Sequence, residues 1–337
     1  MLSFIKKKRY FKMNFSSIII FLIFAIYGSL CTNLLNENET TPCQEEFDND
    51  SVLQVEGNQG TNCEEQKFRE SLLEPPIIEN ITEYIRSLSE NSPEVSNVYL
   101  SSPMDNYMIA DKDGNYGSGY RCIQMLLSSA LLNEDYKNHL VNMWKNLHST
   151  TISRSKMPNV LFLENHLEEC WNKDIQKWRK RELYSKSKYP TRLGITICDI
   201  DSILLLLRIK LGYTIFDRKN NQNHIQDMFK WLHDYFRNEH NKKYVSPVML
   251  QYQNYIVMVV GVEIRKNTQI VPLIVCPSQD YTEITTEHGI NALNIIRSSE
   301  LTLNHSSFTV ITINGIITTD AEYDAMKCSK FRNQNVL

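Results

Sequence analysis

The larger, C-terminal part of the chain divides into segments typical of helices and segments typical of strands. Apolar residues at steps of three and four, or a strongly helical composition, predict four helices, over residues 120–132, 159–181, 199–211 and 228–236. Gly119 is expected to mark the start of the first helix. The third helix has Asp199, Asp201 or Ser202 as a candidate N-cap, and Gly212 is expected to end it.

Strand-forming residues dominate the C-terminal part of the chain, and one short strand precedes the fourth helix. Runs rich in β-branched and aromatic residues predict five strands, over residues 212–216, 247–251, 256–264, 270–275 and 308–313. Pro272 lies inside the fourth run, and because proline cannot donate a ladder hydrogen bond, this strand is expected at a sheet edge or to begin there. Helices first and a mainly antiparallel sheet afterwards predict an α+β fold.

The N-terminus has the pattern of a secretory signal peptide. Five cations between Lys6 and Lys12 precede the apolar run 18–27, and small residues follow it. This run is shorter than the roughly 20 residues that a membrane span needs. Residues 1–31 are therefore expected to be a signal peptide of a secreted or secretory-pathway protein. The alternative is an uncleaved signal anchor, which would make the chain a membrane protein.

Composition divides the remaining chain into three parts. Residues 32–75 are acidic and poor in apolar residues, which predicts a flexible linker. Residues 76–320 are expected to form one folded domain, followed by a C-terminal tail over 321–337. The chain has eight cysteines, enough for several disulfides in a secreted protein, and spacing does not decide their pairing. Four sequons predict glycosylation, at Asn38, Asn49, Asn80 and Asn304.

Charge and motif spacing exclude several kinds of partner. The net charge is −3, and removing the five cations of the leader leaves −8, so a general nucleic-acid binder is excluded. The sequence contains neither a CxxC nor an HxxxH motif, and we expect no metal site and no cofactor. A composition of 42% hydrophobic and 22% charged residues instead predicts a globular domain.

The segment 117–129, GSGYRCIQMLLSS, resembles the catalytic helix of the ubiquitin-fold-modifier-specific protease superfamily. It is most similar to the zinc-finger-containing, polyubiquitin-cleaving branch, in which the pattern is W-G-C-G-Y-R-N-x-Q-M-L-L-S-S-L. Five further segments match that branch in order, at residues 157–171, 229–236, 247–255, 259–263 and 273–278. The resemblance implies a papain-like fold with a Cys-His-Asp triad, and the family's zinc-finger modules are missing from this sequence.

All three triad positions differ from the family pattern. The nucleophilic cysteine falls on Ser118, the base histidine on Tyr255 and the orienting aspartate on Cys276. A serine hydroxyl needs a positioned base, whereas a phenol is protonated at neutral pH and accepts a proton poorly. A thiol cannot replace a carboxylate that fixes an imidazole tautomer. These replacements predict the loss of covalent peptidase turnover.

We therefore expect an inactive peptidase homologue that acts by binding a ubiquitin-like protein or an extended peptide. The predicted binding groove comprises Tyr116, Gly117, Ser118, Gly119, Tyr252 and Tyr255. One alternative is an active hydrolase of ubiquitin-like conjugates, with Ser118 or Cys122 as nucleophile. Cys122 lies one helical turn after Ser118, although a buried structural thiol is the simpler interpretation. Another alternative is a structural or host-facing secreted protein that does not use the groove.

Overall fold

The computed structural model describes residues 76–239, 242–253, 255–298, 303, 305–327 and 334–336. All of them belong to the second of two compact units, Gly60–Leu337. The expected signal peptide (1–31), the linker (32–75) and the sequons at Asn38, Asn49 and Asn304 lie outside the described residues. Among the helices that are described, none combines the length and the apolarity that a membrane crossing requires.

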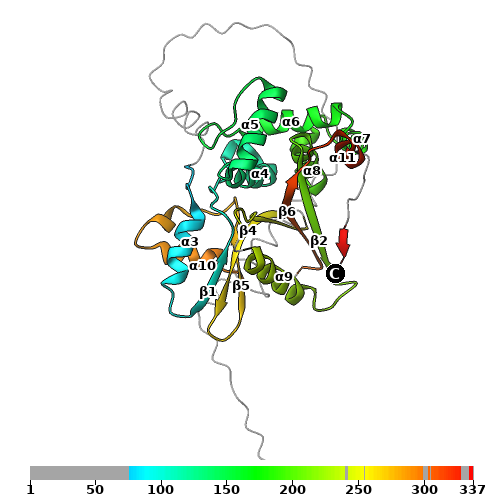
Figure 1. Cartoon of the computed structure of the whole chain (residues 1–337). Helices are drawn as coiled ribbons and strands as arrows, with labels where there is room; N and C mark the ends of the chain where they lie inside the picture. The colour runs from blue at the N-terminus through cyan, green and yellow to red at the C-terminus, as the bar shows by residue number, and fades with distance from the viewer. Residues whose placement is uncertain are drawn as a thin grey trace, which may run out of the picture. The chain divides into compact units, whose positions relative to one another are not determined.

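Seven strands form one mixed sheet in the described part of the chain (Figure 1). The order is β1-β4-β3-β6-β2-β7, and β5 pairs with β4. The strands are β1 (Val95–Leu100), β2 (Ile209–Asp217), β3 (Val248–Tyr252), β4 (Tyr255–Arg265), β5 (Ile270–Val275), β6 (Ser307–Ile316) and β7 (Gln334–Val336). Every pairing is antiparallel except that of β2 with β7.

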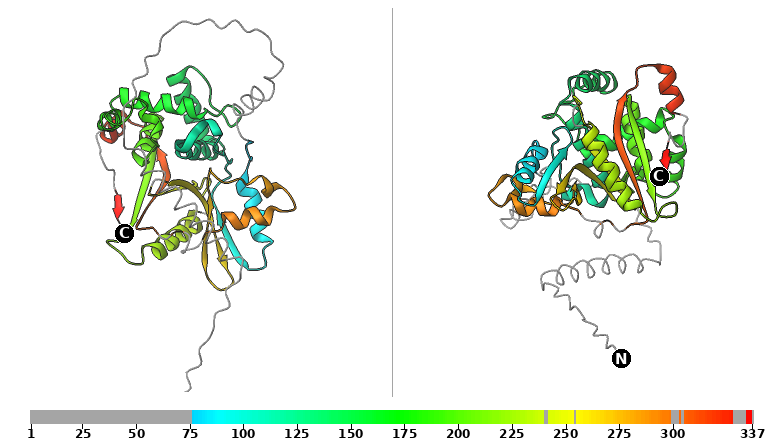
Figure 2. Two further views of the ribbon diagram at one scale, coloured as in Figure 1. Left: turned by 180° about the vertical axis from the view of Figure 1, so that it is seen from behind. Right: turned by 60° about the horizontal axis from the view of Figure 1, so that its bottom comes forward.

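Helices cover both faces of this sheet. The bounds are α3 (Ile81–Glu90), α4 (Gly117–Ala130), α5 (Glu134–His148), α6 (Val160–Asn172), α7 (Lys177–Tyr184), α8 (Ile197–Leu206), α9 (His224–Glu239), α10 (Gly289–Ile296) and α11 (Asp320–Lys327). Helices α4 to α8 gather on one side of the strands and α9 lies on the other (Figure 2). The expected α+β class, with helices packed against a mainly antiparallel sheet, is confirmed.

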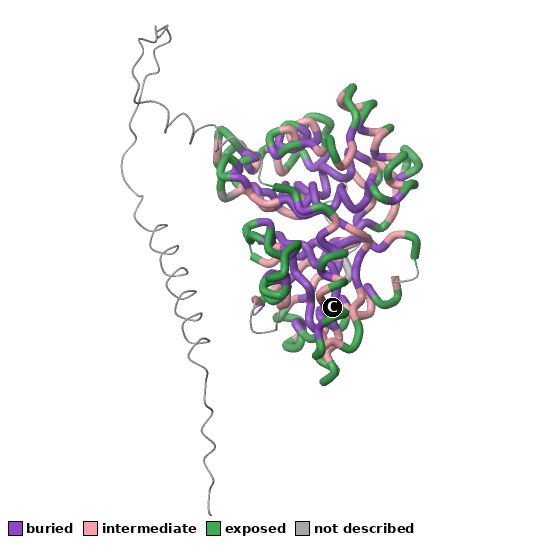
Figure 3. The backbone as a smooth tube through the Cα atoms, turned by 90° about the vertical axis from the view of Figure 1, so that its left-hand side faces the viewer, coloured by how far each residue is buried: buried purple, intermediate pink, exposed green. Residues whose placement is uncertain are grey.

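Strand β4 lies between two hydrophobic cores. Ile256, Met258 and Val260 belong to the core beneath α4, α6 and α8. Val257 and Val259 belong to the core beneath α9. Because successive strand residues point to opposite faces, a strand buried on both sides must be apolar at nearly every position, as β4 is. Figure 3 shows such buried backbone through the interior of this unit and exposed backbone at the turns.

Most predicted elements are present, with shifted ends. The first predicted helix is α4, which begins at Gly117 rather than after Gly119. Helix α9 extends the predicted 228–236 at both ends, and β3, β4, β5 and β6 match the predicted strands within three residues. Pro272 lies in β5, which pairs only with β4 among the described strands and is therefore at an edge, as expected.

The single helix predicted over 159–181 is wrong, because the chain breaks between α6 and α7. Asp174 and Gln176 have left-handed φ values of 64° and 52°. The break buries Ile175 completely and lets the Gln176 side chain donate to Asp201 Oδ2 at 3.2 Å. Tertiary burial of one residue therefore overrides a continuous helical pattern.

The helix predicted over 199–211 is wrong at both ends. Helix α8 begins at Ile197, after a capping box in which Thr196 N–H donates to Asp199 Oδ2 at 2.8 Å. Asp201 and Ser202 are therefore not caps. The helix ends before Arg208, whose φ is 55°, and residues 209–211 belong to β2. Gly212 consequently lies inside a strand and does not end a helix.

Candidate functional site

The first triad position lies at the N-terminus of α4, between two glycines that neighbouring side chains approach closely. A Cβ atom on Gly117 would lie 2.5 Å from Asp113 Cβ, and one on Gly119 would lie 2.4 Å from Ile195 Cγ1. Real Cβ contacts are longer, so both positions require glycine for packing rather than for backbone freedom. Ser118, the second residue of the helix, is half-buried between them.

A buried ionic network fixes the turn that leads into α4. Asp113 Oδ2 accepts hydrogen bonds from Ala110 N–H at 2.9 Å and from Arg121 Nε at 2.7 Å. Arg121 Nη1 donates to Gln124 Oε1 at 3.1 Å, and Gln124 Nε2 donates to the Pro158 carbonyl at 2.7 Å. Arg121 and Gln124 belong to the family-like segment, and these contacts give both of them a role in holding the fold.

The second triad position, Tyr255, opens β4 directly opposite Tyr252 of β3. The two rings stack at 5.8 Å, and Tyr252 also stacks on His305 at 4.7 Å. Tyr255 is 60% exposed, whereas burial raises the pKa of Tyr252 to about 12. The Tyr252 phenol is therefore protonated at neutral pH and cannot act as a general base.

The third position, Cys276, follows β5 and is half-buried. Its backbone N–H donates to Tyr281 Oη at 3.0 Å. Nearby Cys122 is fully buried, and its thiol donates to the Ile256 carbonyl at 3.4 Å. Burial raises the pKa of the Cys122 thiol well above its ordinary value, and Cys276 raises it further. Cys122 is thus a protonated core residue and not an activated nucleophile.

The structure brings together the segments that carry Ser118, Tyr255 and Cys276, but these three described side chains are not joined by hydrogen bonds. A Cβ on Gly119 would lie 3.3 Å from Ile256 Cδ1, so α4 packs directly on the start of β4. Tyr255 precedes Ile256 and points to the opposite face, where its partner Tyr252 packs against the α9 core. Within the described residues, no hydrogen bond links Ser118 to Tyr255 or to Cys276.

A pocket of about 230 Å³ lies beside the N-terminus of α4. Its lining residues are Lys112, Asp113, Tyr116, Asn159, Val160, Leu161, Glu164 and Arg192. Arg192 Nε lies 3.4 Å from Glu164 Oε2, and burial raises the pKa of the Glu164 carboxyl against the opposing effect of Arg192. Tyr189 receives the Arg192 guanidinium over its ring at 5.5 Å. Three exposed apolar side chains lie on the segments around this pocket, Leu161, Tyr189 and Leu193.

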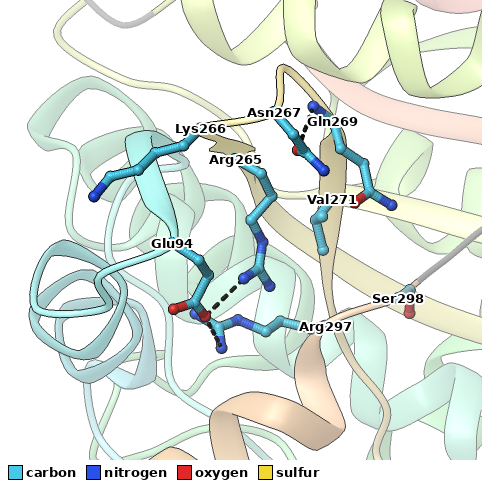
Figure 4. A pocket seen from close by; sticks show the side chains of 8 residues that line it. All are labelled: Glu94, Arg265, Lys266, Asn267, Gln269, Val271, Arg297 and Ser298. Carbon is cyan, nitrogen blue, oxygen red and sulfur yellow. Dashed lines mark hydrogen bonds and ion pairs between the residues drawn. The ribbon is translucent and has the colours of Figure 1, made fainter.

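A larger pocket, of about 520 Å³, lies at the far end of the β4–β5 hairpin (Figure 4). The guanidinium groups of Arg265 and Arg297 converge there on Glu94, at 2.7 and 3.2 Å. Arg297 and Arg265 also pair with the fully buried Glu263, at 2.9 and 3.2 Å. These charges neutralise one another and join β1, β4 and α10. We therefore infer that the cluster stabilises the fold.

Two further expectations concern covalent modification. Asn80 is half-buried and its Oδ1 accepts a hydrogen bond from Arg154 Nη2 at 3.2 Å, and its glycosylation stays a prediction. The four described cysteines are free thiols, Cys122, Cys170, Cys198 and Cys276. Any disulfide would therefore involve cysteines outside the described residues.

Sequence reasoning missed several residues of this region. His305 lies against Tyr252 although it is distant in sequence from every family-like segment. Glu164 and Arg192 join Tyr116 at the pocket from α6 and from the loop after α7. The one sequence signal for this surface is the group of apolar residues around Arg192, namely Tyr189 and Leu193.

Residues 93–308 match the family described as Peptidase family C78. The chain belongs to this family. The match includes α4, Tyr255 and Cys276, so the C78 domain contains the whole candidate site.

Known relatives of this C78 domain include zinc finger-containing ubiquitin peptidase 1 from Rattus norvegicus, with 27% identity over 252 residues. The same protein from Homo sapiens is 25% identical over 266 residues. These matches cover 72% and 75% of this chain but only 41% and 43% of the relatives. The chain thus spans less than half the length of these proteins.

A solved structure, UfSP from C. elegans, is also similar to this C78 domain. The TM-score is 0.40 at 13% sequence identity, and the match covers 67% of this chain and 35% of that protein.

Proposed function

We propose that this chain is an exported, catalytically inactive C78 domain that binds a ubiquitin-like protein or an extended peptide. The observation that carries the proposal is the replacement of all three triad positions, by Ser118, Tyr255 and Cys276. Membership of a peptidase family supports a function related to recognition of peptidase substrates. Export rests on the signal-like pattern of residues 1–31.

The chemistry of the site supports inactivity. Nucleophilic attack by Ser118 requires removal of its proton by a nearby base with a pKa near neutrality. Tyr252, with a pKa of about 12, does not meet this requirement, and Tyr255 is a phenol at the position of the family's imidazole. Cys122 does not replace the lost nucleophile because its thiol is buried and protonated.

The exposed surface supports binding. Tyr255 opens β4 with most of its ring in solvent, and Tyr116 lines the pocket at the start of α4. Tyrosine gives a binding surface a large apolar area, a hydroxyl group and little conformational entropy to lose.

The first experiment measures cleavage of fluorogenic C-terminal conjugates of ubiquitin and related modifiers by the purified full-length chain. The wild type should show no turnover above that of Ser118→Ala. Turnover that Ser118→Ala abolishes would contradict the proposal and support the alternative of an active serine-dependent hydrolase.

A specific observation keeps that alternative testable, since His305 provides an imidazole beside Tyr252. Burial lowers the pKa of His305, so the ring is neutral and able to accept a proton at pH 7. If Ser118-dependent turnover is found, we expect His305→Gln to reduce it. Turnover that His305→Gln leaves unchanged would exclude His305 as the base.

The second experiment measures binding of the same modifiers and of their C-terminal peptides. Tyr255→Ala should weaken binding by roughly tenfold or more, as expected for a central aromatic contact. Tyr84→Ala is the matched control, because Tyr84 is a 40% exposed tyrosine on α3. Equal effects of both substitutions, or binding that neither changes, would favour a structural role that does not use the groove.

A further inference from the structure

Two histidines and a glutamate meet between α5 and α6. His148 is the last residue of α5, while His166 and Glu169 lie three positions apart on α6. One ligand atom from each of them lies within 4.8 Å of the other two. Sequence spacing did not reveal this group, because the two histidines are 18 residues apart and no HxxxH motif contains them.

Hydrogen bonds fix the orientation of the inner imidazole. His166 Nε2 lies 3.3 Å from the Ile203 carbonyl, which can only accept, so this nitrogen carries the proton. His166 Nδ1 therefore holds its lone pair toward His148 Nε2, which lies 2.8 Å away. Burial lowers the pKa of His166 to about 4, which keeps the ring neutral at pH 7. A histidine whose other nitrogen donates to a backbone carbonyl is the usual form of a metal ligand.

Aromatic side chains hold both rings in place. Trp144 stacks on His166 at 5.5 Å and lies 4.7 Å from the His148 ring. Phe162 packs edge-on against His148 at 4.9 Å. His166 is 1% exposed, whereas the Glu169 side chain is 32% exposed and reaches the surface. The cluster is thus closed by apolar groups on the inside and open to solvent at Glu169.

We propose that His148, His166 and Glu169 form a binding site for a divalent transition-metal ion of the Zn²⁺ class. Two imidazole nitrogens and one carboxylate oxygen are ligands that Zn²⁺ takes, with water at a fourth position. Tetrahedral coordination with Zn–N distances near 2.05 Å separates two nitrogens by about 3.3 Å. The His148 and His166 nitrogens, now 2.8 Å apart, must therefore move apart by about 0.5 Å. The proton that His148 Nε2 donates to His166 Nδ1 must leave when the ion binds, and the other ring nitrogen of His148 takes it up. His148 ends its helix and can make this adjustment.

One neighbouring charge opposes the ion. Lys173 Nζ lies 2.8 Å from Glu169 Oε1 and competes for the same carboxylate. The Lys173 side chain is 43% exposed, so it can move into solvent when a metal binds. Removal of this cation should therefore strengthen metal binding, whereas loss of the Glu169 carboxylate should weaken it. Opposite effects of two neighbouring substitutions would not arise from a general change in stability.

The test uses the purified full-length chain after treatment with EDTA. Zn²⁺ is titrated by calorimetry, and Co²⁺ by the visible absorption of its tetrahedral complexes. We expect one ion per chain at this site. His148→Ala and Glu169→Gln should weaken binding by roughly tenfold or more, as found when ligand shells are altered. Lys173→Gln should strengthen binding severalfold. His288→Ala, which removes a 65% exposed histidine elsewhere, should have no effect.

Three outcomes would overturn the proposal. The first is the absence of Zn²⁺ binding to the wild type at micromolar concentrations. The second is binding that neither His148→Ala nor Glu169→Gln weakens. The third is a thiolate-to-Co²⁺ charge-transfer band, which would assign the ion to cysteines. Circular dichroism of each variant checks folding, and Glu169→Gln keeps the test valid if His148→Ala does not fold, because Glu169 lies at the surface.

Discussion

The ion pair of Asp113 with Arg121 should be a major determinant of stability at the start of α4. Both side chains are about 2–3% exposed, and Arg121 Nη2 lies 2.6 Å from Asp113 Oδ2. Asp113→Ala removes the carboxylate that lies closest to the guanidinium but leaves the buried guanidinium in place, and the Gln124 acceptor is neutral. Removing one partner of a buried ion pair costs about 3–5 kcal/mol. We therefore expect Asp113→Ala to lower the free energy of unfolding by that amount.

Urea unfolding at pH 7, followed by circular dichroism, measures this effect. Lys137→Ala is the control, since the Lys137–Glu134 pair is 49% and 63% exposed. An exposed pair is worth about 0–1 kcal/mol. The double variant Asp113→Leu/Arg121→Met should recover much of the loss, because an apolar pair leaves no buried charge. A loss below about 1 kcal/mol in Asp113→Ala would refute the reasoning.

Three other predictions concern neighbouring residues. Gly119→Ala should lower the unfolding free energy by about 1–3 kcal/mol, because the new methyl would overlap Ile195; an unchanged urea midpoint would contradict this packing. Cys122 should not react with a thiol reagent at pH 8 until urea is added, and its rapid labelling in the native chain, identified by mass spectrometry, would show the opposite. His166 has a pKa of about 4 in the folded chain, below the 6.5 of an unfolded histidine. Its contribution to the free energy of unfolding is therefore complete above pH 6.5 and is lost as the pH falls toward 4. This loss amounts to about 3 kcal/mol; unfolding measured across that range should show a steeper decline in the wild type than in His166→Asn, and equal slopes would disprove it.

Local patterns predicted those elements whose structure depends on local interactions. The β-branched runs of β3 to β6 and the apolar segment of α4 are buried as expected, because each carries its own periodicity. The break between α6 and α7 was not predicted, since it depends on Ile175 entering a core built by distant residues. The junction of α8 with β2 was missed for the same reason, because Ile209 and Leu211 pair with β6, a hundred residues later.

In the candidate site, too, the sequence predicted which segments take part but not the contacts between distant residues. The structure places Ser118 in α4, Tyr255 at the start of β4 and Cys276 directly after β5, and the role of these three positions stays a prediction. The resemblance did not predict that His305 would stack on Tyr252, or that Glu164 and Arg192 would meet Tyr116. These contacts join residues that no sequence motif links, so only the folded chain brings them together.

The position of β4 in the sheet has a consequence for synthesis on the ribosome. Strand β1 pairs with the second half of β4, for example Val98 with Glu263, 165 residues later in the chain. Translation at roughly 5–20 residues per second delays this partner by about 8–30 seconds. During that interval β1 has no sheet to join, and neither core can close. Helices α3 to α9 emerge before β4, so a chaperone that protects apolar helical segments would be needed most before residue 265 has left the ribosome.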